Sequence, residues 1–318
     1  MQKLENRFYG YQENILDTLK VRLSKRLFKY LLKFSGGGSK NIVVRTNDMI
    51  SIEPILFDNY ERHITHLFNT SAQLGYSDFF IDIGANIGLS STLSAEYFDK
   101  IYAYEPNPLA FQMLTLNAKL SEYSDKFSLN NYGLGNKDST LCLMIPKHNW
   151  GGAFVRDENN LYDDTLLASK DGFKEFNDSN YMSTDVQICN GSEVIKNIFA
   201  SSDFSDKDNL SGVIKIDVEG MELVIFEEIA KALPNYVKTI IVFENLDPNF
   251  DIDSIQNLFK DREFELYSYN NLRNNDNVKE SFILKTFKKI MRKNIINHKL
   301  VSIDKGDKVH GDLVLVLN

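Results

Sequence analysis

The stretch from Phe79 to Ser90, FFIDIGANIGLS, constrains the fold more than any other part of the chain. An apolar run that ends near Asp82 is followed by a turn containing Gly84 and Gly88, after which the residue pattern becomes helical. Glycines at a strand-to-helix turn let the backbone pass close to a ligand that lies across the carboxyl end of the strand. The stretch therefore predicts an α/β fold with a ligand site at this turn.

The spacing of the turn indicates which ligand it holds. The glycines follow the pattern G-x-x-x-G, whereas dinucleotide-binding turns follow G-x-G-x-x-G. Asp82 stands where it would repel a pyrophosphate, so a cofactor with an ammonium group fits better. This pattern disfavours a nicotinamide-dependent oxidoreductase.

From Asp78 onward, strand and helix patterns alternate, as in a parallel sheet covered by helices on both faces. We expect a domain over 76–318 with a seven-stranded, mostly parallel sheet. The predicted strands lie near 79–83, 101–105, 127–132, 212–218, 238–244, 263–269 and 312–317. The last two strands lack the usual crossover connection, so we expect the last one to be antiparallel.

Residues 1–75 are predicted to form an N-terminal helical extension. Apolar residues at helical spacing predict a basic amphipathic helix over 11–35, which packs on its own domain, forms a homodimer contact or lies on an anionic membrane surface. Residues 41–52 resemble a β-hairpin, and 58–74 predict a helix that caps the sheet. His63 and His66, one turn apart in that helix, favour a solvated face over a metal site.

Two insertions interrupt the predicted domain. Residues 136–193 are polar with little periodicity, and a segment of this length is typical of a substrate lid or binding loop. Residues 270–299 contain the run KTFKKIMRKNIINHK, which predicts a basic helix that is either solvated or helps to dock an anionic substrate.

Charge and cysteine content exclude several classes of protein. The formal net charge of −8 argues against affinity that comes mainly from phosphate neutralisation, so we expect no nucleic-acid partner. Cys142 and Cys189 are the only cysteines, which gives no disulfide framework. The sequence shows neither an apolar leader nor a bilayer-spanning run. We therefore expect a cytoplasmic protein, with peripheral contact at the inner membrane face as an alternative.

The strand after the glycine turn points to a nucleoside cofactor. This strand, 101–105, ends in Glu105, and a carboxylate at this place accepts hydrogen bonds from both ribose hydroxyls in related folds. A glycine turn or a strand-end acid alone is common, but the two in this order predict a cofactor site.

The chain resembles the FkbM-type methyltransferase family in the segments FIDIGANIGLSS, YAYEPNPLAFQMLTLN and VIKIDVEGMELVIFEEI, followed by IIVFEN. The resemblance covers about 78–245. It implies a Rossmann-like class I methyltransferase fold, S-adenosylmethionine (SAM) as cofactor, and O-methylation, with sugar and polyketide hydroxyls among the acceptors.

The resemblance also implies which residues bind SAM. The turn with Asp82, Gly84, Ala85, Asn86 and Gly88 is similar to the methionine-binding turn of the family. Glu105 is similar to the ribose ligand, with Pro106 and Asn107 beside the adenine. Many related folds place an acid after the third strand, but this chain has Gly133 and Leu134 there. We therefore expect backbone groups and apolar side chains to hold the adenine.

Three charged residues follow one another on one face of the fourth predicted strand. Because strand side chains alternate, Lys215, Asp217 and Glu219 should share a face at the carboxyl end of the sheet. A positioned base that takes the proton of an alcohol is typically worth ~10²–10⁴-fold in rate. We expect Asp217 to serve the acceptor hydroxyl, with Lys215 and Glu219 beside it. The alternative is a structural Lys215–Asp217 ion pair, with Glu219 and Glu222 at the following helix terminus.

Other residues could also contribute to the acceptor site. His148 is a rival base, and Trp150 could stack on a sugar ring. Glu244 and Asn245 follow the fifth strand, where Glu244 and Asp217 could offer oxygen ligands to Mg²⁺. The resemblance does not require a metal, so a divalent metal is an alternative that we do not expect.

The sequence thus predicts a SAM-dependent O-methyltransferase that acts on a sugar hydroxyl, in a nucleotide-sugar or a surface polysaccharide. A polyketide or other small-molecule hydroxyl is the alternative acceptor. A non-catalytic SAM-binding protein is the alternative outside enzymes.

Overall fold

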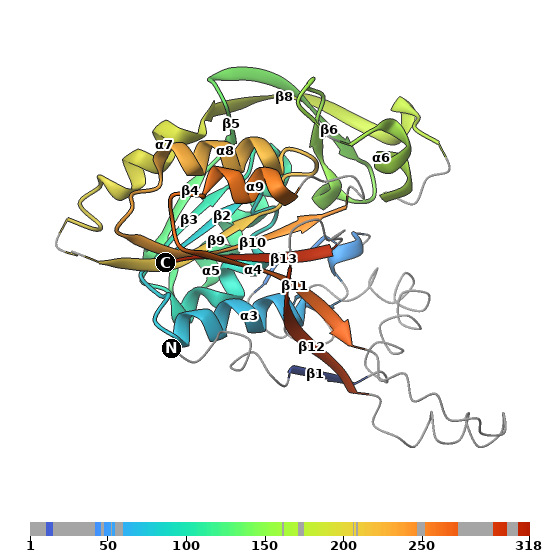
Figure 1. The fold of residues 1–318 in the computed structure, drawn as a ribbon. Coiled ribbons are helices and arrows are strands. Elements are labelled where there is room, and N and C mark those ends of the chain that lie inside the picture. The colour runs from blue at the N-terminus through green and yellow to red at the C-terminus, as the bar shows by residue number, and fades with distance from the viewer. Residues whose placement is uncertain are drawn as a thin grey trace, which may run out of the picture.

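The computed structural model describes residues 11–14, 42–45, 48–51, 53–54, 60–160, 162–170, 175–205, 207, 209–246, 252–272, 295–303 and 311–318. The fold is α/β, as predicted, with one large sheet and one smaller sheet (Figure 1).

All seven predicted strands lie in the large sheet. They are β2 (Phe79–Ile83), β3 (Lys100–Tyr104), β4 (Phe127–Asn130), β9 (Leu210–Ile216), β10 (Val237–Asn245), β11 (Phe264–Leu272) and β13 (Gly311–Leu317). Two more strands, β1 (Tyr11–Asn14) and β12 (Ile295–Ser302), lengthen one edge. Within the described residues the sheet therefore has nine strands, in the order β1-β12-β11-β13-β10-β9-β2-β3-β4, and the predicted count of seven was wrong.

The central strands β4, β3, β2, β9 and β10 pair in parallel. β13 lies between β10 and β11 and is antiparallel to both, which confirms the predicted direction of the last strand. The parallel arrangement brings the carboxyl ends of β2, β3, β9 and β10 to one edge of the sheet. A ligand site is expected at that edge.

Helices cover both faces of the large sheet (Figure 1). The α-helices are α3 (Arg62–Gln73), α4 (Leu89–Ser94), α5 (Pro108–Leu120), α6 (Asp164–Lys170), α7 (Gly191–Phe199), α8 (Glu222–Ala232) and α9 (Ile252–Leu258). Short 3-10 helices are η2 (Met49–Ser51), η3 (Ala95–Tyr97), η4 (Ser124–Lys126), η5 (Trp150–Gly152) and η6 (Asp178–Asn180). In Figure 1, α7, α8 and α9 lie above the sheet and α3, α4 and α5 lie below it.

The strand β2 shows why its residues need two helical layers. Successive side chains of a strand point to opposite faces of the sheet. All five residues of FFIDI are nevertheless buried, so both faces must be covered. Phe79, Ile81 and Ile83 pack in the cluster that includes α7, α8 and α9, whereas Phe80 packs in the cluster that includes α3. An unbroken apolar strand of this kind fixes the centre of the domain and the turn that follows it.

The segment predicted as a lid, 136–193, contributes three strands to a second, smaller sheet, shown in the upper part of Figure 1. The strands of this sheet are β5 (Gly133–Gly135), β6 (Ser139–Pro146), β7 (Phe154–Val155) and β8 (Tyr181–Asn190), in the order β5-β8-β6-β7. Sequence alone suggested little regular structure here, because exposed and half-buried residues alternate irregularly along β8. We call this unit the small sheet.

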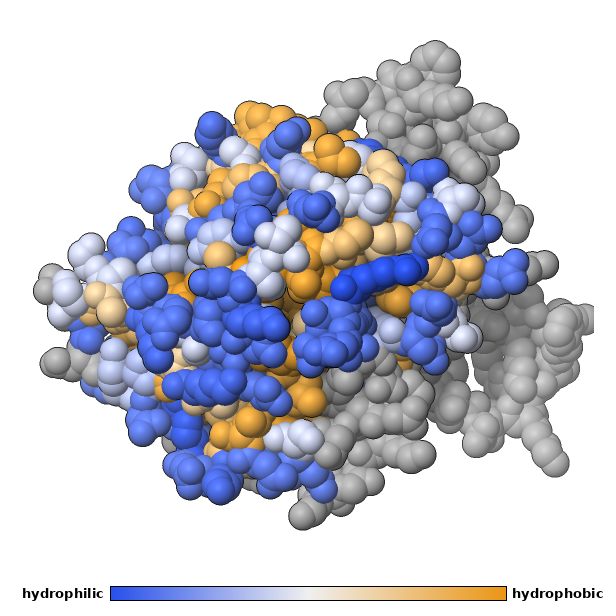
Figure 2. All heavy atoms as spheres, turned by 90° about the horizontal axis from the view of Figure 1, so that it is seen from above, coloured by the Kyte–Doolittle hydropathy of each residue, from blue (hydrophilic) through white to orange (hydrophobic). Residues whose placement is uncertain are grey.

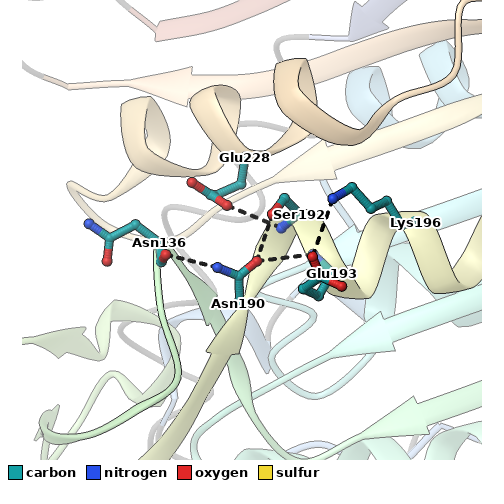
Figure 3. Close-up of polar contacts among 6 residues, drawn as sticks. All are labelled: Asn136, Asn190, Ser192, Glu193, Lys196 and Glu228. Carbon is teal, nitrogen blue, oxygen red and sulfur yellow. Dashed lines mark hydrogen bonds and ion pairs between the residues drawn. The ribbon is translucent and has the colours of Figure 1, made fainter.

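Asn190 joins the small sheet to the helices of the main domain (Figure 3). Its side chain donates to the carbonyl of Asn136 at 2.9 Å and accepts from the backbone N–H of Glu193 at 3.0 Å, so it caps α7. Glu228 of α8 accepts from the backbone N–H of Ser192 at 3.2 Å. The small sheet is thereby held against α7 and α8.

The N-terminal predictions were only partly met. Tyr11–Asn14 is a strand paired with β12, so the helix predicted for 11–35 was wrong there, and its remainder lies outside the described residues. In place of the predicted hairpin, Ile42–Arg45 is irregular and Met49–Ser51 is a 3-10 helix. The predicted capping helix is confirmed as α3, which starts after Glu61 adopts a left-handed conformation.

The basic run in the second insertion was predicted as a helix. Its last residues, 295–299, belong to β12 and pair with β11, which contradicts a helix there. Residues 285–294 lie outside the described residues.

Figure 2 shows the molecule from above, on the side where α7, α8 and the small sheet lie in Figure 1. Hydrophilic side chains cover most of this face, and apolar side chains appear between them in separate patches. No helix in the described part of the chain is long and apolar enough to cross a bilayer.

Candidate active site

Two adjoining cavities lie at the carboxyl ends of the parallel strands. The larger measures about 740 Å³ including its open mouth. The smaller measures about 240 Å³. Asn86 and Asp217 line both cavities, so the two spaces meet at these side chains.

The glycine turn after β2 forms the floor of both cavities. Gly84 has a φ of 83°, and a Cβ atom there would lie 1.9 Å from the carbonyl oxygen of Asp217, so only glycine fits. The backbone N–H groups of Gly84 and Ala85 donate to the carbonyl of Tyr104 at 3.0 and 2.9 Å. The strands β2, β3 and β9 are therefore held in close contact where the ligand site begins.

Glu105 lies directly after β3, with its carboxylate held by the turn. It accepts from the backbone N–H of Asn86 at 2.6 Å and from that of Asn107 at 2.7 Å. Burial raises the pKa of Glu105 to about 7, although these two N–H groups act in the opposite direction. Each carboxylate oxygen can accept a second hydrogen bond, so Glu105 can still receive ribose hydroxyls.

The far end of the larger cavity is apolar and tight. Pro106, Gly133 and Leu134 line it, and Ile188 of the small sheet closes it. A Cβ at Gly133 would lie 2.7 Å from the Ile188 side chain. An apolar wall beside a buried carboxylate suits a nucleoside. The role of Gly133 and Leu134 in holding the adenine stays a prediction.

Lys215 forms the electrostatic centre of the site. Its ammonium lies 2.9 Å from Asp217 Oδ2 and 3.5 Å from Asp82 Oδ1, and its side chain is 9% exposed. Burial alone would lower the pKa of Lys215, but the carboxylates of Asp217, Asp82 and Glu61 outweigh this effect and raise it. Lys215 is therefore a fixed cation that holds Asp217 at the cavity junction.

The turn after β9 separates the three charged residues that were predicted to share a face. The strand ends at Ile216, and Glu219 has a φ of 52°, so the alternation of a strand does not continue to it. Both carboxylate oxygens of Glu222 accept from the backbone N–H of Gly220 at 3.1 Å. Burial raises the pKa of Glu222 to about 8. Lys215 and Asp217 contact each other, whereas Glu219 lines neither cavity.

The predicted site residues therefore fall into two groups. Those that line a cavity are Gly84, Ala85, Asn86, Glu105, Pro106, Gly133, Leu134, Trp150, Lys215 and Asp217. Those that line neither are Asp82, Gly88, Asn107, Glu219, His148, Glu244 and Asn245.

Several residues of the second group support the site from behind. Asp82 is fully buried and accepts from Ser91, besides facing Lys215. Asn107 caps α5 by accepting from the N–H of Leu109 at 3.1 Å. Gly88 packs so closely on Leu114 that a Cβ would lie 2.4 Å from it. His148 is exposed and Asn245 is buried.

Three residues that sequence reasoning did not select also belong here. Ile50 and Tyr60 line the smaller cavity. Glu61 precedes α3 in the left-handed region, and burial together with the charge of Asp217 raises its pKa to about 7. All three precede the glycine turn in a segment without a motif, and the contacts of Asp48 and Arg45 with later residues help to bring that segment to the site.

Among the described residues, no group of His, Cys, Asp and Glu has a geometry that could hold a metal ion. His63, considered above for its spacing to His66, instead lies 3.1 Å from Asp312 Oδ2 and stacks on His298 with ring centroids 4.7 Å apart.

The comparison with known families decides the identity of this site. The model of the methyltransferase FkbM domain matches residues 82–266, which is more than half of the chain. The chain belongs to the FkbM methyltransferase family. The match starts at Asp82 and includes Glu105 and Asp217.

Individual relatives of this FkbM methyltransferase are distant. Methyltransferase sdnD from Sordaria araneosa is 27% identical over 202 residues, which cover 61% of this chain and 76% of that protein. The crystal structure of methyltransferase FkbM from Methylobacillus flagellatus KT is 10% identical, with a TM-score of 0.33, over 94% of this chain and 60% of that one. A SAM-dependent O-methyltransferase from Thermotoga maritima is 10% identical, with a TM-score of 0.37, over 84% of this chain and 69% of that one. The family match alone carries the assignment.

The site fits the cofactor of a SAM-dependent methyltransferase. Glu105 would hold the ribose, the slot formed by Pro106, Gly133 and Leu134 would hold the adenine, and the glycine turn would hold the methionine portion. SAM supplies an electrophilic methyl group on a positively charged sulfur. The negative charges of Asp217 and Asp82, with Lys215 as the only described cation within salt-bridge distance of them, suit a cationic ligand.

Proposed function

We propose that this FkbM methyltransferase transfers a methyl group from SAM to a hydroxyl of a sugar, in a nucleotide-sugar or in a surface polysaccharide under construction. The observation that carries this proposal is the position of Asp217, where the two cavities meet. Its side chain is 40% exposed, so one face of the carboxylate remains accessible while Lys215 holds Oδ2.

Asp217 can orient the acceptor hydroxyl and take its proton. A carboxylate beside an alcohol increases its nucleophilicity as the new bond forms, and a positioned base of this kind typically contributes ~10²–10⁴-fold. Lys215 fixes the direction of the carboxylate through the 2.9 Å contact. Alignment of the hydroxyl with the methyl group supplies the other large contribution.

Further carboxyl groups around Asp217 favour an acceptor with several hydroxyls. Glu244 is the penultimate residue of β10 and pairs in register with Asp312 of β13. Loss of hydration and then the charges of Asp217 and Asp312 raise the pKa of Glu244 to about 8. A carboxyl group with a pKa near neutral can accept from or donate to a hydroxyl, which would suit a sugar ring.

One observation favours a polyketide or other small-molecule hydroxyl as the second candidate. Leu141, Leu143 and Val155 of the small sheet line the larger cavity together with Val218 and Met221. If part of this apolar wall contacts the acceptor rather than the adenine, a less polar acceptor would bind better.

The predicted glycan or small-molecule partner and the absence of a nucleic-acid partner also stay predictions.

A methyl-transfer assay with two acceptor panels distinguishes these candidates. Nucleotide-sugars and oligosaccharides form one panel, hydroxylated polyketides and phenols the other, and mass spectrometry detects the added methyl group. Turnover on the first panel supports the proposal, whereas turnover restricted to the second panel contradicts it.

The variant Asp217→Asn tests the role of the carboxylate. It should lower kcat by ~10²–10⁴-fold with little change in the binding of S-adenosylhomocysteine, whose sulfur carries no positive charge. Asp203→Asn is the matched control, because Asp203 also lies 2.9 Å from a lysine, Lys100, away from both cavities. Equal kcat values for the two variants would exclude Asp217 as the base.

A further inference from the structure

We propose that Arg45 and Asp48 form a clasp that holds Trp150 closed over the SAM pocket, so that these two positioning residues set the rate at which SAM and its product leave. The proposal depends on SAM as the cofactor and is independent of which acceptor is methylated. It concerns residues that precede the family match, which starts at residue 82.

Trp150 is held on its ring and on its backbone. The guanidinium carbon of Arg45 lies 4.2 Å from the centroid of the Trp150 ring, a cation–π geometry. The same guanidinium donates to the carbonyl of Lys147, three residues before Trp150. Asp48 accepts from the backbone N–H of Trp150 at 3.1 Å, and its Oδ2 atom lies 3.5 Å from Arg45. Arg45 and Asp48 therefore fix both ends of one short turn.

This turn forms part of the wall of the SAM pocket. Trp150 and Gly151 both line the larger cavity. A Cβ on Gly151 would lie 2.6 Å from the side-chain nitrogen of Asn86, so the turn rests directly on the methionine-binding loop. The indole Nε1 of Trp150 is buried and has no hydrogen-bond partner among the described residues. A buried donor of this kind is available to a ligand.

The segment that carries the clasp is itself anchored. Asn117 of α5 is fully buried and accepts from the N–H of Val43 at 2.6 Å. It donates to the carbonyls of Val43 at 3.1 Å and of Ile87 at 2.7 Å. The segment is thus tied to the loop at Ile87 that follows the glycine turn, and a few residues later Ile50 lines the smaller cavity. Cofactor binding and the position of this segment are therefore coupled.

The strength of the clasp determines the expected effect. A partly desolvated cation–π contact stabilises the closed position of Trp150. Its loss should speed the dissociation of the ligand by roughly 3- to 30-fold. Because opening precedes departure, weakening the clasp raises the dissociation rate in proportion to the open fraction. It should raise the KM for SAM and leave the methyl-transfer step unchanged.

The lone tryptophan of the chain makes the test direct. In the full-length protein, Trp150 fluorescence supports two measurements. Quenching by acrylamide without ligand measures how exposed Trp150 is. The change in fluorescence when bound S-adenosylhomocysteine is displaced measures the dissociation rate of that ligand. The variants are Arg45→Met, which keeps the length of the side chain, and Arg45→Lys, which keeps its charge. Arg156→Met is the matched control, since Arg156 lies 4.9 Å from the Phe176 ring centroid and 2.9 Å from Asp178, but lines neither cavity.

The clasp predicts an ordered result. Arg45→Met should show stronger quenching and roughly 3- to 30-fold faster dissociation, Arg45→Lys an intermediate rate, and Arg156→Met the wild-type rate. Dissociation within twofold of wild type for Arg45→Met, or an equal effect of Arg156→Met, would overturn the proposal. If Arg45→Met does not fold, Arg45→Lys and Asp48→Asn decide it on the same two measurements.

Failure of the cofactor assignment gives a different outcome. Wild-type protein that binds no S-adenosylhomocysteine contradicts SAM as the cofactor, and with it the effect of the clasp on departure. Quenching would then still show whether Arg45 holds Trp150. Failure of the sugar proposal changes neither measurement.

Discussion

Replacing Lys215 by Met should destabilise the fold far more than a surface ion pair would. Lys215 is 9% exposed and lies between Asp217 and Asp82, and Asp82 is fully buried. Without the lysine, Asp82 keeps only Ser91 as a hydrogen-bond donor among the described residues. Removing one partner of a buried ion pair costs about 3–5 kcal/mol, because the remaining charge is uncompensated.

Thermal unfolding measures this loss. At roughly 2–4 °C per kcal/mol, the midpoint of unfolding should fall by about 6–20 °C. Lys207→Met is the matched control, because Lys207 also contacts two aspartates, Asp78 and Asp99, but is 38% exposed. The control should lose about 1 kcal/mol or less.

One further measurement identifies the cause. The double variant Asp82→Asn with Lys215→Met removes the buried charge and should recover part of the stability. A loss no larger than that of Lys207→Met would refute the view that Lys215 compensates Asp82.

Two more predictions concern cofactor binding. Gly84→Ala should abolish S-adenosylhomocysteine binding in calorimetry, because its Cβ would lie 1.9 Å from the Asp217 carbonyl; retained micromolar binding would contradict this. The pKa of Glu105 is raised to about 7, so binding should weaken up to tenfold per pH unit below that value as the ribose-binding carboxylate is protonated. The folded protein then holds this proton more tightly than the unfolded chain, so the stabilising contribution of Glu105 is complete below about pH 4.5 and is lost as the pH rises through 7. Glu105→Gln should flatten both profiles, and parallel profiles for variant and wild type would exclude Glu105 as the source.

The sequence predicted the central sheet well because its signals are local. β2 is buried along its whole length and is apolar except for Asp82. In the turn that follows it, Gly84 leaves no room for a side chain. The edge of the sheet was less predictable. Ile295–Ser302 contains Asn297, His298 and Lys299, which resemble a basic helix in isolation, but pairing with β11 makes the segment a strand. Tertiary pairing outweighs intrinsic preference at such positions.

The same distinction separates the site residues that could be predicted from those that could not. Glu105 and Asp217 stand directly after strand ends, where the parallel topology brings side chains to one edge of the sheet whatever the surroundings. Glu219 was placed beside them only by extending strand alternation, which stops at Ile216. Tyr60 lines the smaller cavity, although no pattern in the sequence marks it.

Some residues of the site lie within the family match, and others precede it. The family match begins at residue 82 and includes the residues that face the expected cofactor. Ile50 and Tyr60 line the smaller cavity, and Arg45 holds Trp150 over the larger one, yet all three precede the match. A domain cut at residue 76 would therefore keep Glu105 and Asp217 but lose one wall of the site. Such a domain should bind SAM more weakly than the whole chain, because the smaller cavity would lose Ile50 and Tyr60 from its lining and Trp150 would lose its contacts with Arg45 and Asp48.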